Sequence, residues 1–582
     1  MTGHASIGDR SGEDVNRDAF ARSTVRMSVL TAVSRATGFV RVIVVAAVLG
    51  TSYLGNTYQS ANTVPNILFE LLAAGALQAV LVPSMVELLD AGREDEAEEV
   101  AGSVLGIVAS LLAGLVAAGI VTAPWIMRIL TATVDDPAIR AQEIALGQFF
   151  LWFFLPQVIL YAANMVATAV LNAKHHFALP VFAPVLNNVV VICTYVLFWY
   201  MRDGQEPTLE LSLAEKTVLA GGTTLGVLAF CAVPVIGVWR TGFRLLPKLN
   251  HRHPGVRRLG RLGAWAVVFL AMTQVLLIVV LLLANGVEGG VVVYQVAYVM
   301  FMLPHSLFSV PVMTTLFPRL SREAQRREWA QYGDTVVRGL RSIGFFTLPA
   351  AALTMALAPL LAQVIIFGAA SGRATAVAAA MAAFAPGVVG FGALLFLTRA
   401  FYAVDDARTP ALVNIGVAVA GSIAMFVSFW RLPESDKVTG LAASYSFGML
   451  LGAAVLLGLL RLVVLGDRAR LSGLWPSLLR RLVAAGLAGV AVYLAAVAVP
   501  DGGRVAALVQ LLVLAPLGVA IYLLLQWILG GAPPREALRH LGSTERADPE
   551  TNAIRVTNTG GQEPTTHDEL EDPVPTDEME RG

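Results

Sequence analysis

The stretch 27–49 reads MSVLTAVSRATGFVRVIVVAAVL, and it decides the class of fold. It is an apolar run long enough to cross the roughly 30 Å hydrocarbon core of a membrane as one helix, yet it carries Arg35 and Arg41. A charged side chain at such depth is costly and usually faces a watery cavity or a partner. A guanidinium stays protonated and its planar fork fits phosphate oxygens. The two arginines therefore predict a buried cationic site for an anionic group.

The composition places the rest of the chain in the same class. Of the 582 residues, 56% are hydrophobic and 14% are charged, and the mean hydropathy is +0.69. These values exclude an ordinary soluble domain, in which roughly a quarter of the residues are charged. The net charge is zero, so we expect no nucleic-acid partner, since such proteins carry a basic face. Cys193 and Cys231 fall inside apolar segments and are interpreted as packed side chains rather than metal ligands.

Apolar runs of about twenty residues predict fourteen transmembrane helices in an all-α polytopic membrane protein. The predicted spans are 27–49, 57–88, 99–122, 144–171, 177–201, 217–239, 262–285, 290–317, 342–367, 375–402, 409–430, 439–465, 476–499 and 505–530. Arginine and lysine gather in the loops after spans six, eight and twelve, whereas the opposite loops are short and poor in basic residues. The positive-inside rule therefore predicts that both termini are cytoplasmic. Residues 1–24 contain no apolar core, so we expect no cleavable signal peptide.

Short segments of the two halves resemble one another at a separation of about 230 residues. AVLNAKHHFALP and AFYAVDDARTP align Ala173 with Ala403, and VPSMVE and FPRLSRE align Pro83 with Pro318. Transporters are commonly built from such internal repeats, with the substrate site between them. The offset spans six helices, so both copies have the same orientation. The pattern predicts two six-helix lobes related by a pseudo-two-fold axis around a central cavity, followed by two further helices.

This organisation predicts six regions along the chain. They are a cytoplasmic segment (1–24), an N-lobe (25–240), a basic cytoplasmic linker (241–261), a C-lobe (262–466), a helix pair (467–530) and a disordered acidic cytoplasmic tail (531–582). The tail is rich in Pro, Thr, Asp and Glu and nearly free of aromatic residues, so it cannot bury enough surface to fold alone. It is a solvated extension, a phosphorylated segment or a docking segment for a partner.

The sequence contains no recognisable motif for nucleotide or metal chemistry. A P-loop needs glycine before lysine, and the four lysines follow Ala173, Glu215, Pro247 and Asp436. There is no H-E-x-x-H helix and no cluster of cysteine and histidine at zinc spacing. We therefore expect no cofactor and no enzyme activity. Any transport would be driven by the substrate gradient, by the membrane potential, by the gradient of an ion such as a monovalent ion, or by chemistry elsewhere.

Polar residues inside the predicted spans are the remaining candidates for a site. Arg35 and Arg41 differ by about 240° in azimuth on an ideal helix, so both face one cavity only if it is wide or the helix bends at Gly38. Glu70 is a candidate counter-ion or a coupling-ion site, and the two interpretations stay open. Asn66 and Gln295 are candidate polar residues of the cavity, although interhelical hydrogen bonding is the more common role of such residues.

Three stretches together resemble the MurJ (MviN) lipid II flippases. They are SRATGFVRVIVVAAVLG, VPNILFELLAAGALQAVLVPSM and ATAVLNAKHHFALPVFAPVLNNVVVI, and the similarity extends over roughly residues 24–530. The resemblance implies the MOP transporter fold, with helices thirteen and fourteen forming a groove for a lipid tail. It also implies the substrate, the undecaprenyl-pyrophosphate-linked disaccharide pentapeptide of peptidoglycan synthesis. By motif match, Arg35 and Arg41 fall on the arginines thought to hold its diphosphate.

The sequence departs from the best-known members of this family at three places. It has Asn56 where they carry an acidic residue, and Phe69 followed by Glu70 where they carry an arginine. The stretch YQVAYVMFMLP holds no charge where they carry an arginine in helix eight. The predicted cavity is consequently less cationic than theirs.

The combined prediction is a flippase that moves lipid II from the inner to the outer leaflet of the bacterial cytoplasmic membrane by alternating access. Its partners would be lipid II, membrane lipids and cell-wall synthesis proteins that dock on the tail. An ion-coupled drug or metabolite antiporter that uses Glu70 is the first alternative. A cell-wall scaffold that does not transport is the second.

Overall fold

The computed structural model describes residues 8–71, 75–248, 264–466, 471, 473–500 and 502–530, with side chains omitted at 8–28, 75–80, 83 and 264–267. The chain divides into a unit of Met1–Gly531 and a unit of Ala532–Gly582. The second unit lies outside the described residues, and so does most of the predicted linker at 241–261. The predictions for the acidic tail therefore remain predictions.

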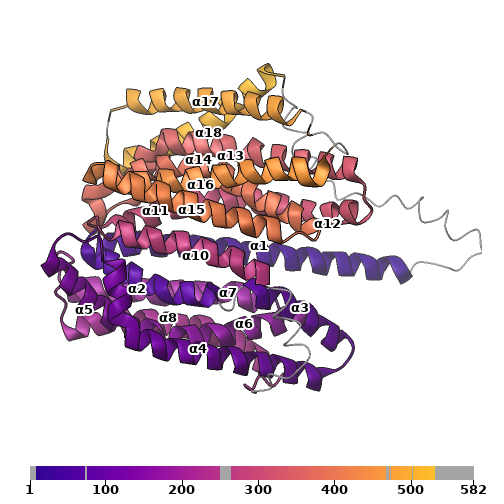
Figure 1. Ribbon diagram of the computed structural model, residues 1–582, viewed down its shortest axis with the longest axis horizontal. Coiled ribbons are helices and arrows are strands. Elements are labelled where there is room, and N and C mark those ends of the chain that lie inside the picture. The colour runs from indigo at the N-terminus through magenta and orange to yellow at the C-terminus, as the bar shows by residue number, and fades with distance from the viewer. Residues whose placement is uncertain are drawn as a thin grey trace, which may run out of the picture. The chain divides into compact units, whose positions relative to one another are not determined.

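The described part of the chain is helical, as predicted (Figure 1). Its long helices are α1 (Gly8–Leu49), α2 (Tyr53–Phe69), α3 (Gly75–Asp90), α4 (Glu94–Leu130), α5 (Pro137–Phe154), α6 (Gln157–Ala173), α7 (Ala178–Met201), α8 (Leu213–Arg240), α10 (Ala264–Ala284), α11 (Gly290–Pro304), α12 (Val310–Gln325), α13 (Trp329–Ile365), α14 (Ala374–Ala403), α15 (Arg408–Arg431), α16 (Lys437–Leu459), α17 (Leu474–Ala498) and α18 (Gly503–Ile528). Short π or 3-10 turns are η2 (His305–Ser309), η3 (Gly368–Arg373), η4 (Glu434–Asp436) and η5 (Leu460–Leu465).

Within these ranges, 12 helical segments are long and apolar enough to cross a membrane, where the sequence predicts fourteen spans. The two predicted spans that differ are 57–88 and 262–285. The first is divided into α2 and α3, because the helix passes into a π turn at Glu70 and Leu71. The second corresponds to α10, whose described apolar part, Val268–Ala284, is shorter than the other spans. The fourteen predicted spans thus correspond to 12 long helical segments and to shorter helices among the described residues.

Two other predicted spans contain a break at a proline. The span 144–171 consists of α5 and α6, which meet at Pro156, and the span 290–317 contains the π turn η2 directly after Pro304. Proline has no backbone N–H and its ring collides with the preceding turn, so it interrupts the regular hydrogen-bond ladder of a helix. π turns inside α-helices frequently mark functional positions.

Helix lengths and helix ends support the predicted internal repeat. α4 and α13 each have 37 residues and begin 235 positions apart, and α7 and α15 each have 24 residues and begin 230 positions apart. The helices that precede α7 and α15 end in the same left-handed turn, with φ of 59° at both His175 and Asp405. The following amides, of His176 and Asp406, donate back to Leu171 and Phe401 in the same way.

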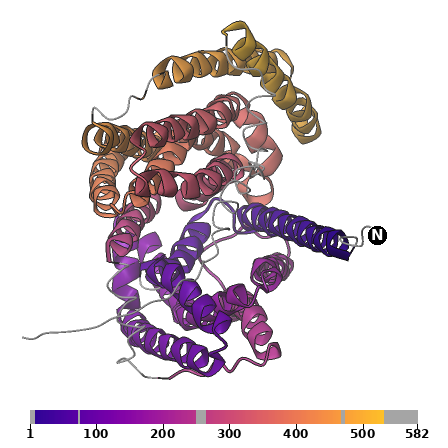
Figure 2. The same cartoon turned by 90° about the vertical axis from the view of Figure 1, so that its right-hand side faces the viewer.

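The helices of the first unit form two groups by their packing (Figures 1 and 2). In the first helix group, α1–α8, helix α7 packs against α1 and α8, and α5 packs against α2. In the second helix group, α10–α16, helix α14 packs against α13 and α16, and α15 packs against α10 and α16. α17 and α18 pack against α13 from outside. The residue boundaries of the predicted lobes stay a prediction.

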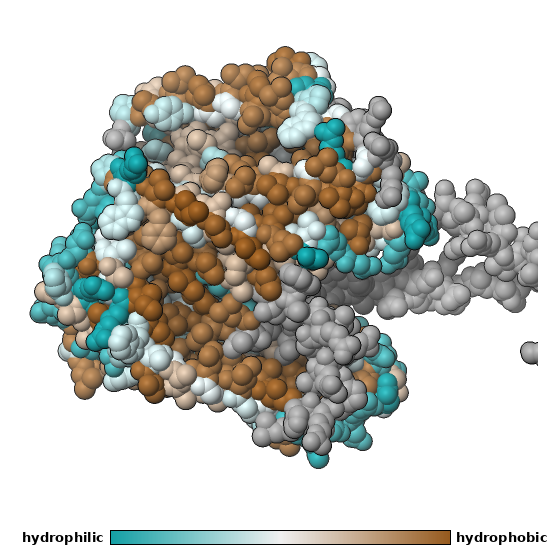
Figure 3. Space-filling model, viewed as in Figure 1, coloured by the Kyte–Doolittle hydropathy of each residue, from teal (hydrophilic) through white to brown (hydrophobic). Residues whose placement is uncertain are grey.

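The outer surface of the helices is apolar in a central zone and hydrophilic at both ends of the helices, as Figure 3 shows for one face. Large side chains on this surface are well exposed, among them Val121, Leu462 and Leu512. Exposed tryptophans include Trp125, Trp239, Trp430, Trp475 and Trp527. Soluble proteins rarely expose so much contiguous apolar surface. The distribution is that of a multi-pass membrane protein whose lipid-facing side chains lack protein neighbours.

Candidate functional site

The predicted pair of site arginines, Arg35 and Arg41, lies on one continuous helix, α1, and the two side chains differ in their surroundings. Arg41 is half-buried and its Nη1 lies 3.5 Å from Oδ1 of Asn188 on α7, to which it donates. With the Asn187 amide turned to donate to the Gly226 carbonyl, its oxygen also accepts from Arg41 Nη1 at 3.2 Å. Two amide oxygens of α7 thus hold this guanidinium against the first helix group.

Arg35 lies on a different side of α1. It is exposed, and its charge is within electrostatic range of His305, in the π turn η2 of the second helix group. His305 is 3% exposed, and its ring packs edge-on against Phe391 with 4.5 Å between the ring centroids. Its Nδ1 has no hydrogen-bond partner among the described residues. The azimuthal separation expected for the two arginines is therefore realised. Arg41 faces one helix group and Arg35 lies near the other.

Glu70 follows α2 in the π turn and is half-buried. Among the ion pairs recorded for the described residues, none joins Glu70 to Arg35 or Arg41. The geometry thus provides no counter-ion contact in this conformation. Both interpretations of Glu70, counter-ion and coupling site, remain predictions.

The two predicted cavity amides, Asn66 and Gln295, line the same cavity. Its volume is about 390 Å³, within the range of small-molecule sites, and it lies between α1, α2, α10, α11 and α16. Its polar and aromatic lining also includes Thr63, Thr273, Gln274, Tyr294, Tyr298 and Tyr445. The tyrosines form a packed cluster, with the Tyr298 and Tyr445 rings perpendicular at 5.8 Å. The structure therefore brings both amides to one space between the helix groups, and the sequence provided no signal for the tyrosines.

A buried hydrogen-bond network joins the two helix groups at the end of the molecule where α2 begins. Asn56 is 0% exposed; its Nδ2 donates to the Val287 carbonyl at 2.8 Å, and its Oδ1 accepts from the Val291 amide at 3.0 Å. One turn further along α2, Ser60 donates to Asn285 Oδ1 at 3.2 Å. These contacts link residues more than two hundred positions apart. The only hint in the sequence is the unusually polar run NTYQS within an apolar segment.

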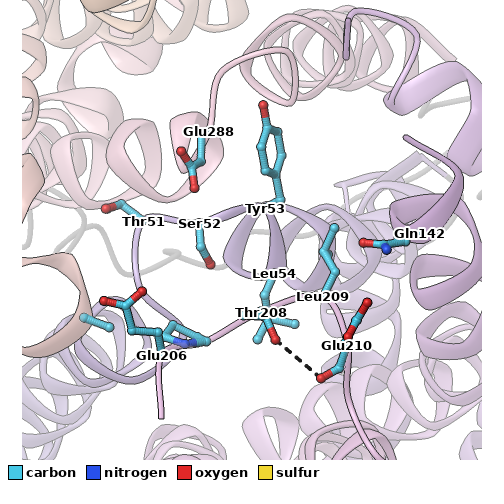
Figure 4. A pocket seen from close by; sticks show the side chains of 12 residues that line it. Thr51, Ser52, Tyr53, Leu54, Gln142, Glu206, Thr208, Leu209, Glu210 and Glu288 are labelled. Atoms are coloured by element: carbon cyan, nitrogen blue, oxygen red, sulfur yellow. Dashed lines mark hydrogen bonds between the residues drawn. The ribbon is translucent and has the colours of Figure 1, made fainter. Parts of the chain in front are cut away.

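At the same end lies a second pocket, of about 510 Å³ (Figure 4). It is lined by Thr51, Ser52, Tyr53, Leu54, Gln142, Glu206, Pro207, Thr208, Leu209, Glu210, Glu288 and Ala369. Three of these residues are glutamates, from the loop between α7 and α8 and from the loop between α10 and α11. Sequence reasoning did not identify this pocket, because its lining comes from five separate segments.

The family profile described as "Lipid II flippase MurJ" matches residues 45–514. The chain belongs to the lipid II flippase MurJ family. The match includes the end of α1, all of α2–α17 and the first 12 of the 26 residues of α18, so most of both helix groups is part of the family's common structure. The family comprises membrane transporters of peptidoglycan synthesis rather than enzymes, as predicted from the sequence.

Curated relatives agree with this assignment. The chain is 28% identical over 415 residues to the lipid II flippase MurJ of Burkholderia cenocepacia, covering 70% of this chain and 78% of that protein. It is 27% identical over 512 residues to the probable lipid II flippase MurJ of Rhizobium meliloti, covering 86% and 92%.

Solved structures establish the fold. A lipid II flippase MurJ in an inward closed conformation superposes with a TM-score of 0.68 at 18% identity, over 87% of this chain and 98% of that one. An inward-facing multidrug-resistance transporter of the MATE family, from the MOP superfamily, superposes with a TM-score of 0.59 at 15% identity, over 74% and 96%. This chain therefore shares its fold with a transporter of the MOP superfamily, which is the fold that the resemblance implied.

The buried contacts of Asn56 explain one of the places where the sequence departs from the best-known members of the MurJ family. Where the best-known members carry an acidic residue, Asn56 supplies both an amide donor and a carbonyl acceptor. A carboxylate accepts but does not donate, so it could not make the bond to the Val287 carbonyl while ionised. The neutral amide therefore suits a contact that is fully buried between the helix groups.

Proposed function

We propose that this chain transports lipid II from the inner to the outer leaflet of the bacterial cytoplasmic membrane by alternating access, with its diphosphate held by Arg35 and Arg41. The observation that carries the proposal is the position of these two guanidinium groups. They lie on one membrane-spanning helix, α1, which also contributes Val42 to the lining of the cavity of about 390 Å³ that contains Asn66 and Gln295.

The charges favour a diphosphate over a neutral or cationic ligand. Arg41 contacts only the oxygens of neutral amides among its recorded partners, so its charge is oriented without being neutralised. Arg35 is exposed, which leaves its donors available to a ligand. Charge-assisted hydrogen bonds to phosphate oxygens are roughly twice as strong as neutral ones. Asn66 and Gln295 would then bind the polar part of the same headgroup.

The polyprenyl tail would remain in the lipid phase along α17 and α18. Both helices pack on α13 and expose apolar side chains, including Leu482, Leu487 and Leu512. In this scheme both termini are cytoplasmic, and the network around Asn56 closes the extracytoplasmic side. Cell-wall synthesis proteins would bind the acidic tail, and the predicted lobe boundaries of 25–240 and 262–466 define the two moving bodies.

The test is leaflet-resolved measurement of lipid II in cells that depend on variants of this protein. An externally added enzyme that cleaves only outward-facing headgroups reports the flipped fraction. We expect Arg35→Ala and Arg41→Ala each to raise total lipid II and to reduce the cleavable fraction roughly tenfold or more, since a charged hydrogen bond contributes about 1.5–3 kcal/mol. Arg41→Lys keeps the charge and should retain part of the activity.

Arg128→Ala is the matched control. This arginine also belongs to a membrane-spanning helix, α4, but it lies over the Trp125 ring at 4.8 Å on the outer surface. It should leave the cleavable fraction unchanged. If both alanine variants at wild-type abundance keep the wild-type cleavable fraction, the arginines do not hold the substrate and the proposal is wrong.

A further inference from the structure

A buried carboxyl group outside the cavity has no role in the function proposed above. Glu143 lies on α5, is 0% exposed, and its Oε2 has no hydrogen-bond partner. Its Oε1 lies 3.0 Å from the hydroxyl of Thr57 on α2. Among the described residues it makes no ion pair.

Burial, together with the contacts of Thr57, indicates which form of this carboxyl is present. The Thr57 hydroxyl lies 2.8 Å from the Tyr53 carbonyl and 3.0 Å from Glu143. A hydroxyl has one proton, and the carbonyl can only accept. That proton goes to Glu143 Oε1 or to the carbonyl, and in the second case the carboxyl donates to Thr57 in return, which requires the neutral acid. Burying a carboxylate with no cation beside it would cost several kcal/mol, so burial favours the same form.

The charged and titratable groups around Glu143 do not change this conclusion. Tyr53, on α2, is within electrostatic range of Glu143 and carries no positive charge. Arg140, one turn earlier on α5, directs its guanidinium to the Arg128 carbonyl of α4 at 3.3 Å. On α8, Glu215 is paired with Arg202. The part of α6 that the structure describes brings no charged side chain to Glu143.

A pocket is lined by two near neighbours of this group. Gln142, adjacent in sequence, and Tyr53 both line the pocket shown in Figure 4. Thr57 follows Asn56, which holds the two helix groups together. Separation of the groups at this network would expose Asn56, which is the neighbour of Thr57 in sequence.

We propose that Glu143 is a proton-binding site that links protonation to closure of this end of the molecule. In the closed arrangement the buried carboxyl binds a proton. When the end opens, the hydrated carboxyl releases the proton to water in the pocket and becomes a carboxylate. Because the closed form binds the proton more tightly, acid favours closure and rising pH favours opening. The proposal rests on the alternating access of the proposed function and adds the ion that is coupled to it.

The experiment measures distances between spin labels on the full chain in lipid nanodiscs, as a function of pH and without lipid II. Gln205 and Ser371 are exposed and belong to segments that meet at this end, since a Cβ on Gly50 would lie 3.1 Å from both Pro207 and Ala369. Replacing Cys193 and Cys231 by serine leaves two introduced cysteines for labelling. One coupled proton predicts that the ratio of open to closed molecules rises by up to about tenfold per pH unit.

The neutral isostere Glu143→Gln should remove this pH dependence and keep the short distance. Glu210→Gln, an exposed glutamate of the same pocket, is the matched control and should leave the dependence intact. A wild-type ratio that does not change with pH, an unchanged slope in Glu143→Gln, or a slope lost in Glu210→Gln would each overturn the proposal.

A second variant covers the case in which Glu143→Gln does not fold. Thr57→Val preserves shape and the carboxyl but removes its hydrogen-bond partner, so it should move the midpoint of the transition without abolishing it. An unmoved midpoint would also overturn the proposal. Since no substrate is present, failure here leaves the arginine test intact, and failure of the arginine test leaves this one intact.

Discussion

The network around Asn56 leads to a quantitative prediction about the closed end of the molecule. Asn56→Ala removes the donor to the Val287 carbonyl and the acceptor for the Val291 amide. The Val287 carbonyl keeps a second bond, from the Gly290 amide at 2.8 Å, whereas the Val291 amide is left without this acceptor in a residue that is 1% exposed. The substitution therefore acts mainly through one orphaned, buried N–H group.

The size of the effect follows from these contacts. An unsatisfied buried donor costs about 1–3 kcal/mol, and loss of the bond to a carbonyl that retains another partner adds about 0.5–1.5 kcal/mol. Both penalties apply to the closed arrangement, because water satisfies the same groups once the helix groups separate. The total penalty of about 1.5–4.5 kcal/mol shifts the ratio of open to closed molecules by roughly 12-fold at the least and roughly 1,600-fold at the most.

The labels at Gln205 and Ser371 report this ratio at constant pH. Asn62→Ala is the matched control, since it removes the same side chain from the same helix and has no recorded bond to the second helix group. Asn56→Ala should increase the long-distance population, and Asn62→Ala should not. Equal distance distributions for Asn56→Ala and the wild type would refute the view that this network holds the end closed.

Two further predictions concern stability. Gly390→Ala would place a Cβ 2.6 Å from the Leu450 backbone nitrogen where α14 packs on α16, so it should destabilise the protein by about 1–3 kcal/mol and lower Tm in a thermal melt. Gly114→Ala, which adds a methyl group in open space on α4, should leave Tm unchanged. An equal Tm for the two variants would contradict the close approach of α14 and α16. Glu215→Ala removes both the reciprocal cap with Ser212 at the start of α8 and the 3.1 Å ion pair with the 8%-exposed Arg202 side chain, so we expect a loss of about 2–4 kcal/mol in the same assay. Glu210→Ala, in the loop that precedes α8, should change Tm little. If Glu215→Ala had the same Tm as Glu210→Ala, the cap and the ion pair would contribute nothing to stability.

The sequence by itself determined the class of fold and the principal candidate site. The apolar runs predict membrane-spanning helices because the bilayer leaves the backbone no other way to satisfy its hydrogen bonds than within a helix. Arg35 and Arg41 were recognisable for the same reason, since charge is conspicuous in an apolar span. The repeat between Ala173 and Ala403 was visible because equivalent helix ends need equivalent turn residues.

Only the tertiary structure decided which way these groups face and what they meet. Which groups Arg35 and Arg41 meet depends on the neighbours of α1. These neighbours, Asn188 of α7 and His305 of η2, lie far from the arginines in the sequence. Asn56 and Glu143 resemble many other polar residues within apolar segments. Their importance arises from burial and from single partners, Val287, Val291 and Thr57, that packing brings to them. A local pattern specifies the periodicity of a helix, but the contacts between helices far apart in the chain depend on how the whole bundle packs.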